Sequence, residues 1–150
     1  MTVRVQRENF DPGAEMDALC AGRLDVGACA SFVGLVRAAN DGRGVAAMTL
    51  EHYPGMTEAA LEDIVQQAGR RWNILDTLVI HRYGELRPGD RIVLVVVIGA
   101  HRGEAFAACE FIMDYLKTQA PFWKKESTPD GQRWVEAKTS DDDAAARWRE

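Results

Sequence analysis

The segment Arg91–Ala100 reads RIVLVVVIGA, and its core from Ile92 to Ile98 is the longest uninterrupted apolar run in the chain. The run has the length of a strand and falls well short of the roughly 18 residues of a membrane-spanning helix. A strand that is apolar at nearly every position is normally buried on both faces of its sheet. The segment therefore predicts a central strand that other elements cover on both sides.

Other segments on either side of this run also have the composition of strands, because β-branched and aromatic residues alternate with small or polar ones. We expect strands at Ala28–Ala38, Val45–Tyr53, Leu75–Leu86, Phe122–Glu126 and Arg133–Lys138. Turns with glycine, proline, asparagine or aspartate separate them. These turns are NDGRG from Asn40, RPGD from Arg87 and TPDG from Thr128.

Two segments have the spacing of amphipathic helices. The first is Pro54–Trp72, in which Pro54 suits a helix start. The second is Gly103–Thr118, which must end before Pro121 because the residue before a proline disfavours helical geometry. Its apolar stripe consists of Phe106, Cys109, Met113 and Leu116. Shorter helical stretches are expected within residues 11–24, and Ser140 with three following aspartates predicts a C-terminal helix.

The order of these elements predicts one α+β domain, residues 1–150, with helices packed on a mostly antiparallel or mixed sheet. The net charge of −5 argues against a general nucleic-acid binder. The N-terminus lacks the apolar region of a secretory signal, so we expect a cytoplasmic protein. The cysteines Cys20, Cys29 and Cys109 have no metal-like spacing, and we expect them to be reduced, buried and small apolar residues.

Positive or titratable side chains stand at the ends of several predicted elements, where functional residues often gather. Arg37 closes the first long strand, and His101 and Arg102 directly follow the buried strand. A helix N-terminus and an adjacent arginine together suit an anion such as phosphate. The alternative is an ordinary surface pair in a turn.

Lys117 lies in the last turn predicted for the second helix, and Lys124 lies in the strand after Pro121. If that strand alternates, Lys124 and Glu126 share a face with Phe122. A lysine beside apolar walls can have its pKa lowered enough for proton transfer or nucleophilic attack. A solvated lysine in a last helical turn is the plainer interpretation.

No other motif indicates chemistry. His52 and His81 stand in predicted strands without partners at metal-like spacing, and we interpret both as structural. The chain has no dinucleotide-binding, Walker-type, nucleophile-elbow or zinc-protease motif, and hence no sequence sign of a metal or cofactor. The residues alone indicate an α+β domain with a possible anion pocket.

Several longer strings resemble the catalytic large subunit of molybdopterin synthase, in the same order and spacing from about Gly27 to Trp148. They are SFVGLVR, LEHYPGMTE, VIHRYGELRPGD, AHRGEAF, EFIMDYLKTQAPFWKKE and DGQRWVEAK. The resemblance implies an α/β hammerhead-type fold with an additional small antiparallel β subdomain. It implies a sulfurtransferase of molybdenum cofactor biosynthesis, which converts cyclic pyranopterin monophosphate to molybdopterin.

The resemblance also implies partners. The dithiolene sulfurs would arrive as a thiocarboxylate on the C-terminal Gly-Gly of a small ubiquitin-like sulfur carrier. A homodimer would bind two carriers and form a heterotetramer. No nucleic acid, membrane, metal or cofactor is implied.

Carried over residue by residue, the resemblance makes Lys117 and Lys124 catalytic. Both also count among the substrate-binding residues, which are Leu35, Val36, Arg37, His101, Arg102, Lys117, Lys124, Lys125 and Glu126. Which of them acts as acid, base or covalent acceptor stays open. An alternative function is a docking module that binds a ubiquitin-like partner without chemistry, although docking alone would not require both lysines. A single-strand nucleic-acid binder using Trp123 and the lysines is disfavoured by the net charge.

Overall fold

The computed structural model describes residues 1–40, 43–44, 46–128, 131–135 and 139–149. Its strands are β1 (Thr2–Gln6), β2 (Ala28–Leu35), β3 (Ala39–Asn40), β4 (Arg43–Gly44), β5 (Ala47–His52), β6 (Asp76–Arg82), β7 (Gly84–Leu86), β8 (Arg91–Gly99), β9 (Phe122–Thr128) and β10 (Gly131–Val135). Its helices are α1 (Pro12–Cys20), α2 (Met56–Arg71), α3 (Arg102–Gln119) and α4 (Thr139–Ala146). The predicted α+β class is confirmed.

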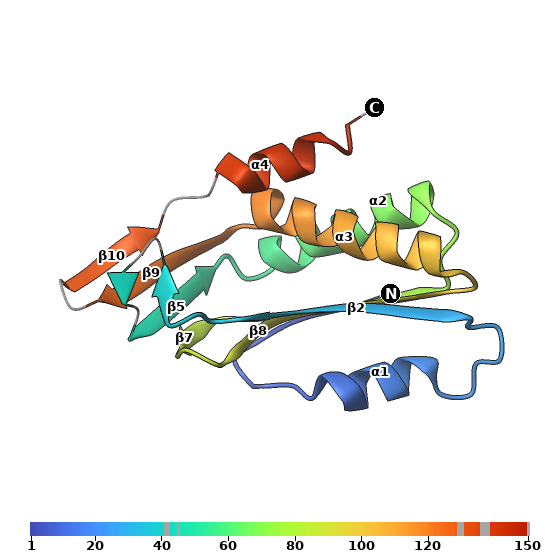
Figure 1. Ribbon diagram of the computed structural model, residues 1–150, viewed down its shortest axis with the longest axis horizontal. Helices are drawn as coiled ribbons and strands as arrows, with labels where there is room; N and C mark the ends of the chain where they lie inside the picture. Colours follow the sequence, from blue (N-terminus) through green and yellow to red (C-terminus); the bar gives the residue numbers. More distant parts are fainter. Residues whose placement is uncertain (41–42, 45, 129–130, 136–138, 150) are drawn as a thin grey trace.

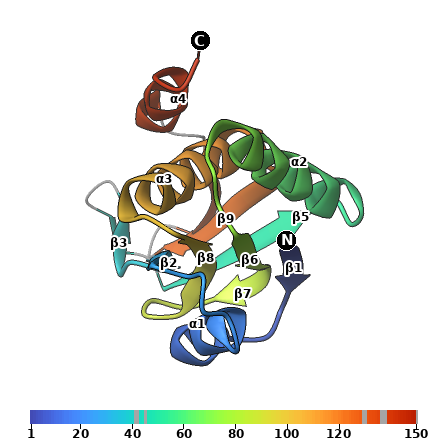
Figure 2. The ribbon, with the colours of Figure 1, turned by 90° about the vertical axis from the view of Figure 1, so that its right-hand side faces the viewer.

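The first sheet has the strand order β1-β6-β8-β2, with β1 parallel to β6 and the other pairs antiparallel. Helices α2 and α3 cover one face of this sheet and α1 covers the other (Figures 1 and 2). Strand β8 lies inside the sheet, and its residues from Leu94 to Ile98 are completely buried. The prediction from the apolar run is therefore confirmed.

The second sheet has the order β10-β9-β5-β7, is antiparallel throughout, and lies at one end of the molecule (Figure 1). The single strand expected at 75–86 is wrong, because the chain leaves the first sheet after Arg82 and enters the second at Gly84. Gly84 has φ +91°, and a Cβ there would lie 2.9 Å from the Arg7 guanidinium. Glycine therefore allows the chain to change sheets here.

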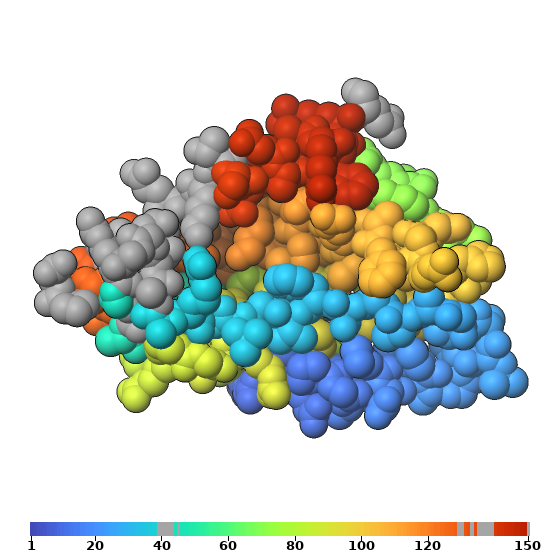
Figure 3. Space-filling model, viewed as in Figure 1, coloured from blue at the N-terminus to red at the C-terminus, as the bar shows by residue number. Residues whose placement is uncertain are grey.

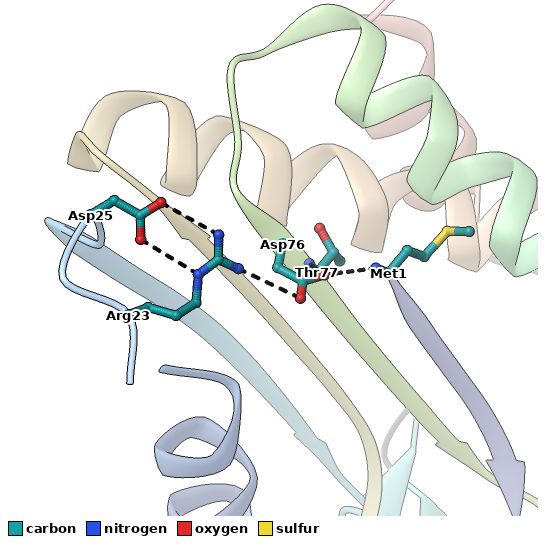
Figure 4. Close-up of polar contacts among 5 residues, drawn as sticks. All are labelled: Met1, Arg23, Asp25, Asp76 and Thr77. Atoms are coloured by element: carbon teal, nitrogen blue, oxygen red, sulfur yellow. Dashed lines mark hydrogen bonds and ion pairs between the residues drawn. The ribbon is translucent and has the colours of Figure 1, made fainter. Parts of the chain in front are cut away.

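The N-terminal strand β1 is missing from the sequence-based prediction. It pairs with β6 along its whole length, from Thr2 beside Leu78 onwards. The N-terminal ammonium group donates to Asp76 at 2.7 Å, and Arg23 reaches the same carboxylate at 3.8 Å (Figure 4). Partial burial, the largest single effect, raises the pKa of Asp76, but the N-terminal ammonium group, the Thr77 backbone N–H and Arg23 together hold it below its usual range.

The helix boundaries differ in detail from the expected ones. Helix α2 begins at Met56, because Gly55 at φ +84° is its N-cap and Pro54 lies in the preceding turn. Helix α3 ends before Pro121 as predicted, with Ala120 already extended at ψ 135°. The expected hairpin is formed by β9 and β10; residues 41–42, 129–130 and 136–138 of the expected turns and last strand lie outside the described residues.

Two predictions of burial are wrong. Phe106 is 65% exposed, since Ala105, Ala108 and Cys109 are the residues of α3 that face the core in this region. Cys29 is exposed because β2 is the edge strand of the first sheet, visible as a surface strip between α1 and α3 in Figure 3. Among the described residues no helix is long and apolar enough to cross a membrane.

Candidate active site

The two lysines lie on either side of a sharp change of direction in the chain. Lys117 is in the last turn of α3 and exposed, and β9 begins at Phe122, directly after Pro121. Lys124 is half-buried in β9. Both lysines act electrostatically on the same buried side chain, His81 of β6. Both lysines therefore lie in the electrostatic neighbourhood of one buried residue.

Strand β9 separates its side chains between the two faces of the second sheet. Phe122, Lys124 and Glu126 pair in register with His52, Leu50 and Met48 of β5. Leu50 and Met48 are buried in a small apolar cluster with Val36 and Leu86, which marks this face as the inner one. The alternation predicted for residues 122–126 is confirmed by this register.

Glu126 is only 3% exposed on the inner face. Few carboxylates are buried so deeply unless they are paired, and Glu126, Lys117 and Lys124 all take part in polar or electrostatic interactions. Lys125 belongs to the opposite face, where its ammonium group lies 5.5 Å from the Trp134 ring centroid. It lines a shallow hollow there with Thr49, Glu85 and Ser127. Lys124 and Glu126 thus share the inner face of β9, and Lys125 lies on the outer face.

His81 is the residue that sequence reasoning missed. Its side chain is buried, and its ring stacks on Phe122 with a centroid distance of 3.8 Å and an interplanar angle of 19°. The Nδ1–H group donates to the Arg82 carbonyl oxygen at 2.8 Å. Burial is the main cause that lowers the pKa of His81 to about 3; the hydrogen bond to Arg82 opposes this shift, and the charges of Lys117, Lys124 and His52 add to it. The one sequence signal for His81 is its position in VIHRYGELRPGD, a string that belongs to the family resemblance.

The end of β2 reaches the same end of the molecule. Val36 is hydrogen-bonded through its backbone to Asp90 and Gly89 at 2.9 Å each, and its side chain joins the inner apolar cluster. Leu35 is 53% exposed and Arg37 is exposed. Since β2 is antiparallel to β8, its end lies beside Arg91, and α3 runs back along β8 towards that end (Figure 1). Residues 35–37 and Lys117 therefore belong to one end of the fold.

His101 and Arg102 belong to the other end. His101 is the N-cap of α3 and Arg102 is its first residue. An α-helix rises about 1.5 Å per residue, so Arg102 and Lys117 are separated by roughly 22 Å along the helix axis. Within one chain, the expected anion-binding pair and the lysine pair do not form a single site.

The lysines of this site can stabilise negative charge and transfer protons. Ammonium groups beside a partly apolar wall stabilise developing negative charge better than they would in water. A lysine in such surroundings can also deliver a proton. Among the described residues, no three His, Cys, Asp or Glu side chains are grouped as a metal site.

Comparison with known proteins identifies the family. The sequence profile of the MoaE protein family matches residues 5–119. The chain is 65% identical over 147 residues to a molybdopterin synthase catalytic subunit of Ralstonia nicotianae, covering 98% of this chain and 84% of that protein. It is 57% identical over 150 residues to the Pseudomonas aeruginosa catalytic subunit, covering 100% of both.

A solved structure supports the same family assignment. The molybdopterin biosynthesis MoaE protein from Burkholderia ambifaria superposes with a TM-score of 0.84 at 58% sequence identity, covering 98% of this chain and 97% of that one. The profile match covers residue 117 and ends before β9, whereas the match to the Pseudomonas aeruginosa relative extends across β9 as well. The resemblance seen in the sequence is confirmed: the chain belongs to the MoaE family of molybdopterin synthase catalytic subunits.

Proposed function

We propose that this chain is the catalytic subunit of a molybdopterin synthase and that residues 1–150 act as one catalytic domain. It converts cyclic pyranopterin monophosphate to molybdopterin, with sulfur taken from a thiocarboxylate at the C-terminus of a small ubiquitin-like carrier. Family membership supports the reaction. The observation that supports the residue assignment is the position of Lys124 on the inner face of β9 with the buried Glu126, while Lys117 lies in the last turn of the helix that leads into this strand.

The chemistry of sulfur insertion explains the need for these groups. Attack of a thiocarboxylate on the pterin side chain builds negative charge, which preorganised ammonium groups stabilise. Opening of the cyclic phosphate requires a proton for the leaving oxygen, which a lysine ammonium group can supply. Lys117 and Lys124 are assigned these two roles jointly, and Glu126 shares a face of β9 with Lys124.

Substrate binding is assigned to the neighbouring cations and the end of β2. Arg37 suits the phosphate because a guanidinium group can donate two parallel hydrogen bonds to it. Leu35 and Val36 form the adjoining wall. Lys125 stays a predicted substrate contact, although its position on the outer face of β9 makes it the weakest of the set.

A homodimer would bring residues from the two ends of α3 into one site. His101 and Arg102 lie too far from Lys117 to share its site within one chain, so a second protomer would supply them. Exposed apolar side chains on β2 and the start of α3, namely Phe32, Leu35 and Phe106, support a protein contact there. Each protomer would bind one carrier, as a heterotetramer in the cytoplasm.

A docking module without catalysis is the second candidate. The lysine pair argues against it, since docking alone would not require Lys117 together with Lys124, which shares a face of β9 with the buried Glu126. Incubation with thiocarboxylated carrier and the cyclic pterin distinguishes the two. Dithiolene product supports the synthase, and carrier binding without product supports the docking module.

A further inference from the structure

His81 lies where the two sheets meet. It belongs to β6 of the first sheet, and its ring packs face to face on Phe122 of β9 in the second. On β5, the ring of His52 is 5.9 Å from Phe122 and 4.5 Å from Tyr83. The lysine-bearing strand is thus held against the body of the protein by an aromatic stack that contains an imidazole.

The hydrogen bond of His81 determines which nitrogen carries the proton. The Arg82 carbonyl oxygen, 2.8 Å from Nδ1, can only accept. Nδ1 must therefore carry the hydrogen, and Nε2 of the neutral ring has a lone pair. With its pKa lowered to about 3, the ring stays neutral at any physiological pH.

The His81 ring lies in a cationic neighbourhood. Lys124 is two residues from Phe122 on the same face of β9, and Lys117 precedes Pro121 by one helical turn. The groups whose charge acts on the ring are Lys117 from α3, Lys124 from β9 and His52 from β5. A phenylalanine or leucine would fill the same buried space without a polar atom, so filling the core does not account for an imidazole here.

We propose that His81 is a positioning residue of the catalytic site, whose Nε2 accepts a hydrogen bond from a lysine ammonium group and holds it in place for sulfur transfer. This inference rests on the proposed function and adds a residue to it. An imidazolium could not accept such a bond, so the position requires a ring that remains uncharged next to two cations. Its burial and its bond to Arg82 provide this condition.

Three substitutions separate positioning from packing. His81→Gln retains an acceptor near the place of Nε2, His81→Asn retains a donor near Nδ1 for the Arg82 carbonyl, and His81→Phe retains only the stack on Phe122. A misplacement of about 1 Å can cost about 100-fold in rate. We expect single-turnover sulfur transfer to remain within about tenfold of wild type for Gln and to fall about 100-fold for Asn and Phe.

His52→Gln is the matched control, because it removes an imidazole from the same stack at a distance from the proposed hydrogen bond. It should lower the melting temperature without a comparable loss of rate. If His81→Phe transfers sulfur as fast as His81→Gln or faster, His81 contributes only packing, and the inference is wrong. Wild-type protein that makes no dithiolene product contradicts the proposed function itself, which is a different result.

A measurement on the intact site decides the matter even if the variants unfold. Nitrogen-15 NMR of histidine in the wild-type complex with carrier should show His81 protonated at Nδ1 and bare at Nε2 from pH 5 to 8. The Nε2 resonance should shift in Lys117→Ala or in Lys124→Ala. A protonated Nε2, or a resonance that neither substitution moves, overturns the proposal.

Discussion

The two sheets of this protein differ in what their buried positions contain. In the first sheet, the residues of β8 from Leu94 to Ile98 are apolar and fully buried, with helices on both faces. In the second sheet, β9 places Lys124 and Glu126 on the inner face beside an apolar cluster. The first sheet provides stability, and the second places charged groups where water is partly excluded, which is the condition that catalysis by ammonium groups requires.

The largest effect on the first sheet is expected from truncating its central strand. Leu94→Ala removes a fully buried side chain, and a substitution of this kind costs about 2–5 kcal/mol of unfolding free energy. The remaining folded protein should transfer sulfur at the normal rate. Urea unfolding and single-turnover assays measure the two quantities, and a rate that falls in proportion to the lost stability would remove the distinction between the sheets.

The contact between the two sheets is expected to lose stability in acid because of His81, whose ring on β6 of the first sheet packs on Phe122 of the second. Its pKa of 6.5 when unfolded falls to about 3 when folded. Between these values the unfolded chain takes up a proton that the folded one does not, so stability is complete above pH 6.5 and is lost as the pH falls, by about 1.4 kcal/mol per pH unit.

His81→Phe should remove this pH-dependent part of the stability. Between pH 6.5 and 5 the free energy of unfolding of the wild type should fall by about 2 kcal/mol more than that of the variant. Urea unfolding at both pH values measures this difference. Equal losses would show that His81 is not held neutral by the fold.

A smaller effect is expected at the end of β2. Arg37→Lys replaces a two-pronged donor with a point charge, and its binding of the cyclic pterin phosphate should weaken by about tenfold while the rate at saturation changes little. Because Arg37 is exposed, stability should not change. Titration of single-turnover rate against substrate concentration measures both parameters. A lost rate at saturation with unchanged affinity would assign Arg37 to the chemical step.

The smallest effect is expected from the cysteines. Burial raises the pKa of Cys109 to about 12, and partial desolvation together with the neighbouring Cys20 raises the pKa of the largely exposed Cys29, so neither is poised as a thiolate sulfur carrier. A folded variant with Cys20, Cys29 and Cys109 all changed to alanine should keep its sulfur-transfer rate. A stable variant lacking only one of them that lost turnover would indicate a covalent sulfur intermediate on this chain.

The features that could be predicted from the sequence are those that local residue patterns determine. The apolar run in β8 predicted a covered central strand, and the proline after α3 predicted where that helix ends. The strand at 75–86 was not seen to divide, because the break depends on the positive φ of Gly84, which the strand-like pattern of residues around it does not reveal. β1 was missed because its short, mixed composition becomes a strand only through pairing with β6.

The site shows a similar limit. Lys117, Lys124 and Glu126 could be named from the resemblance, and the alternation of β9 could be predicted from strand geometry. The role of His81 depends on a stack between strands of different sheets, which no local pattern reports. The separation of His101 and Arg102 from Lys117 follows only from the observed length and direction of α3.

The central claim is that the end of the fold built around β9 performs the chemistry through a lysine that does more than supply charge. Single-turnover sulfur transfer by Lys117→Arg, with saturating thiocarboxylated carrier, tests it most directly. Guanidinium keeps the positive charge but has no amine that can release a proton or accept an acyl group. The variant should be about 100-fold or more slower than wild type and as inactive as Lys117→Ala, while both still bind the carrier. Near-normal product formation by Lys117→Arg would contradict the claim and leave Lys117 a purely electrostatic role.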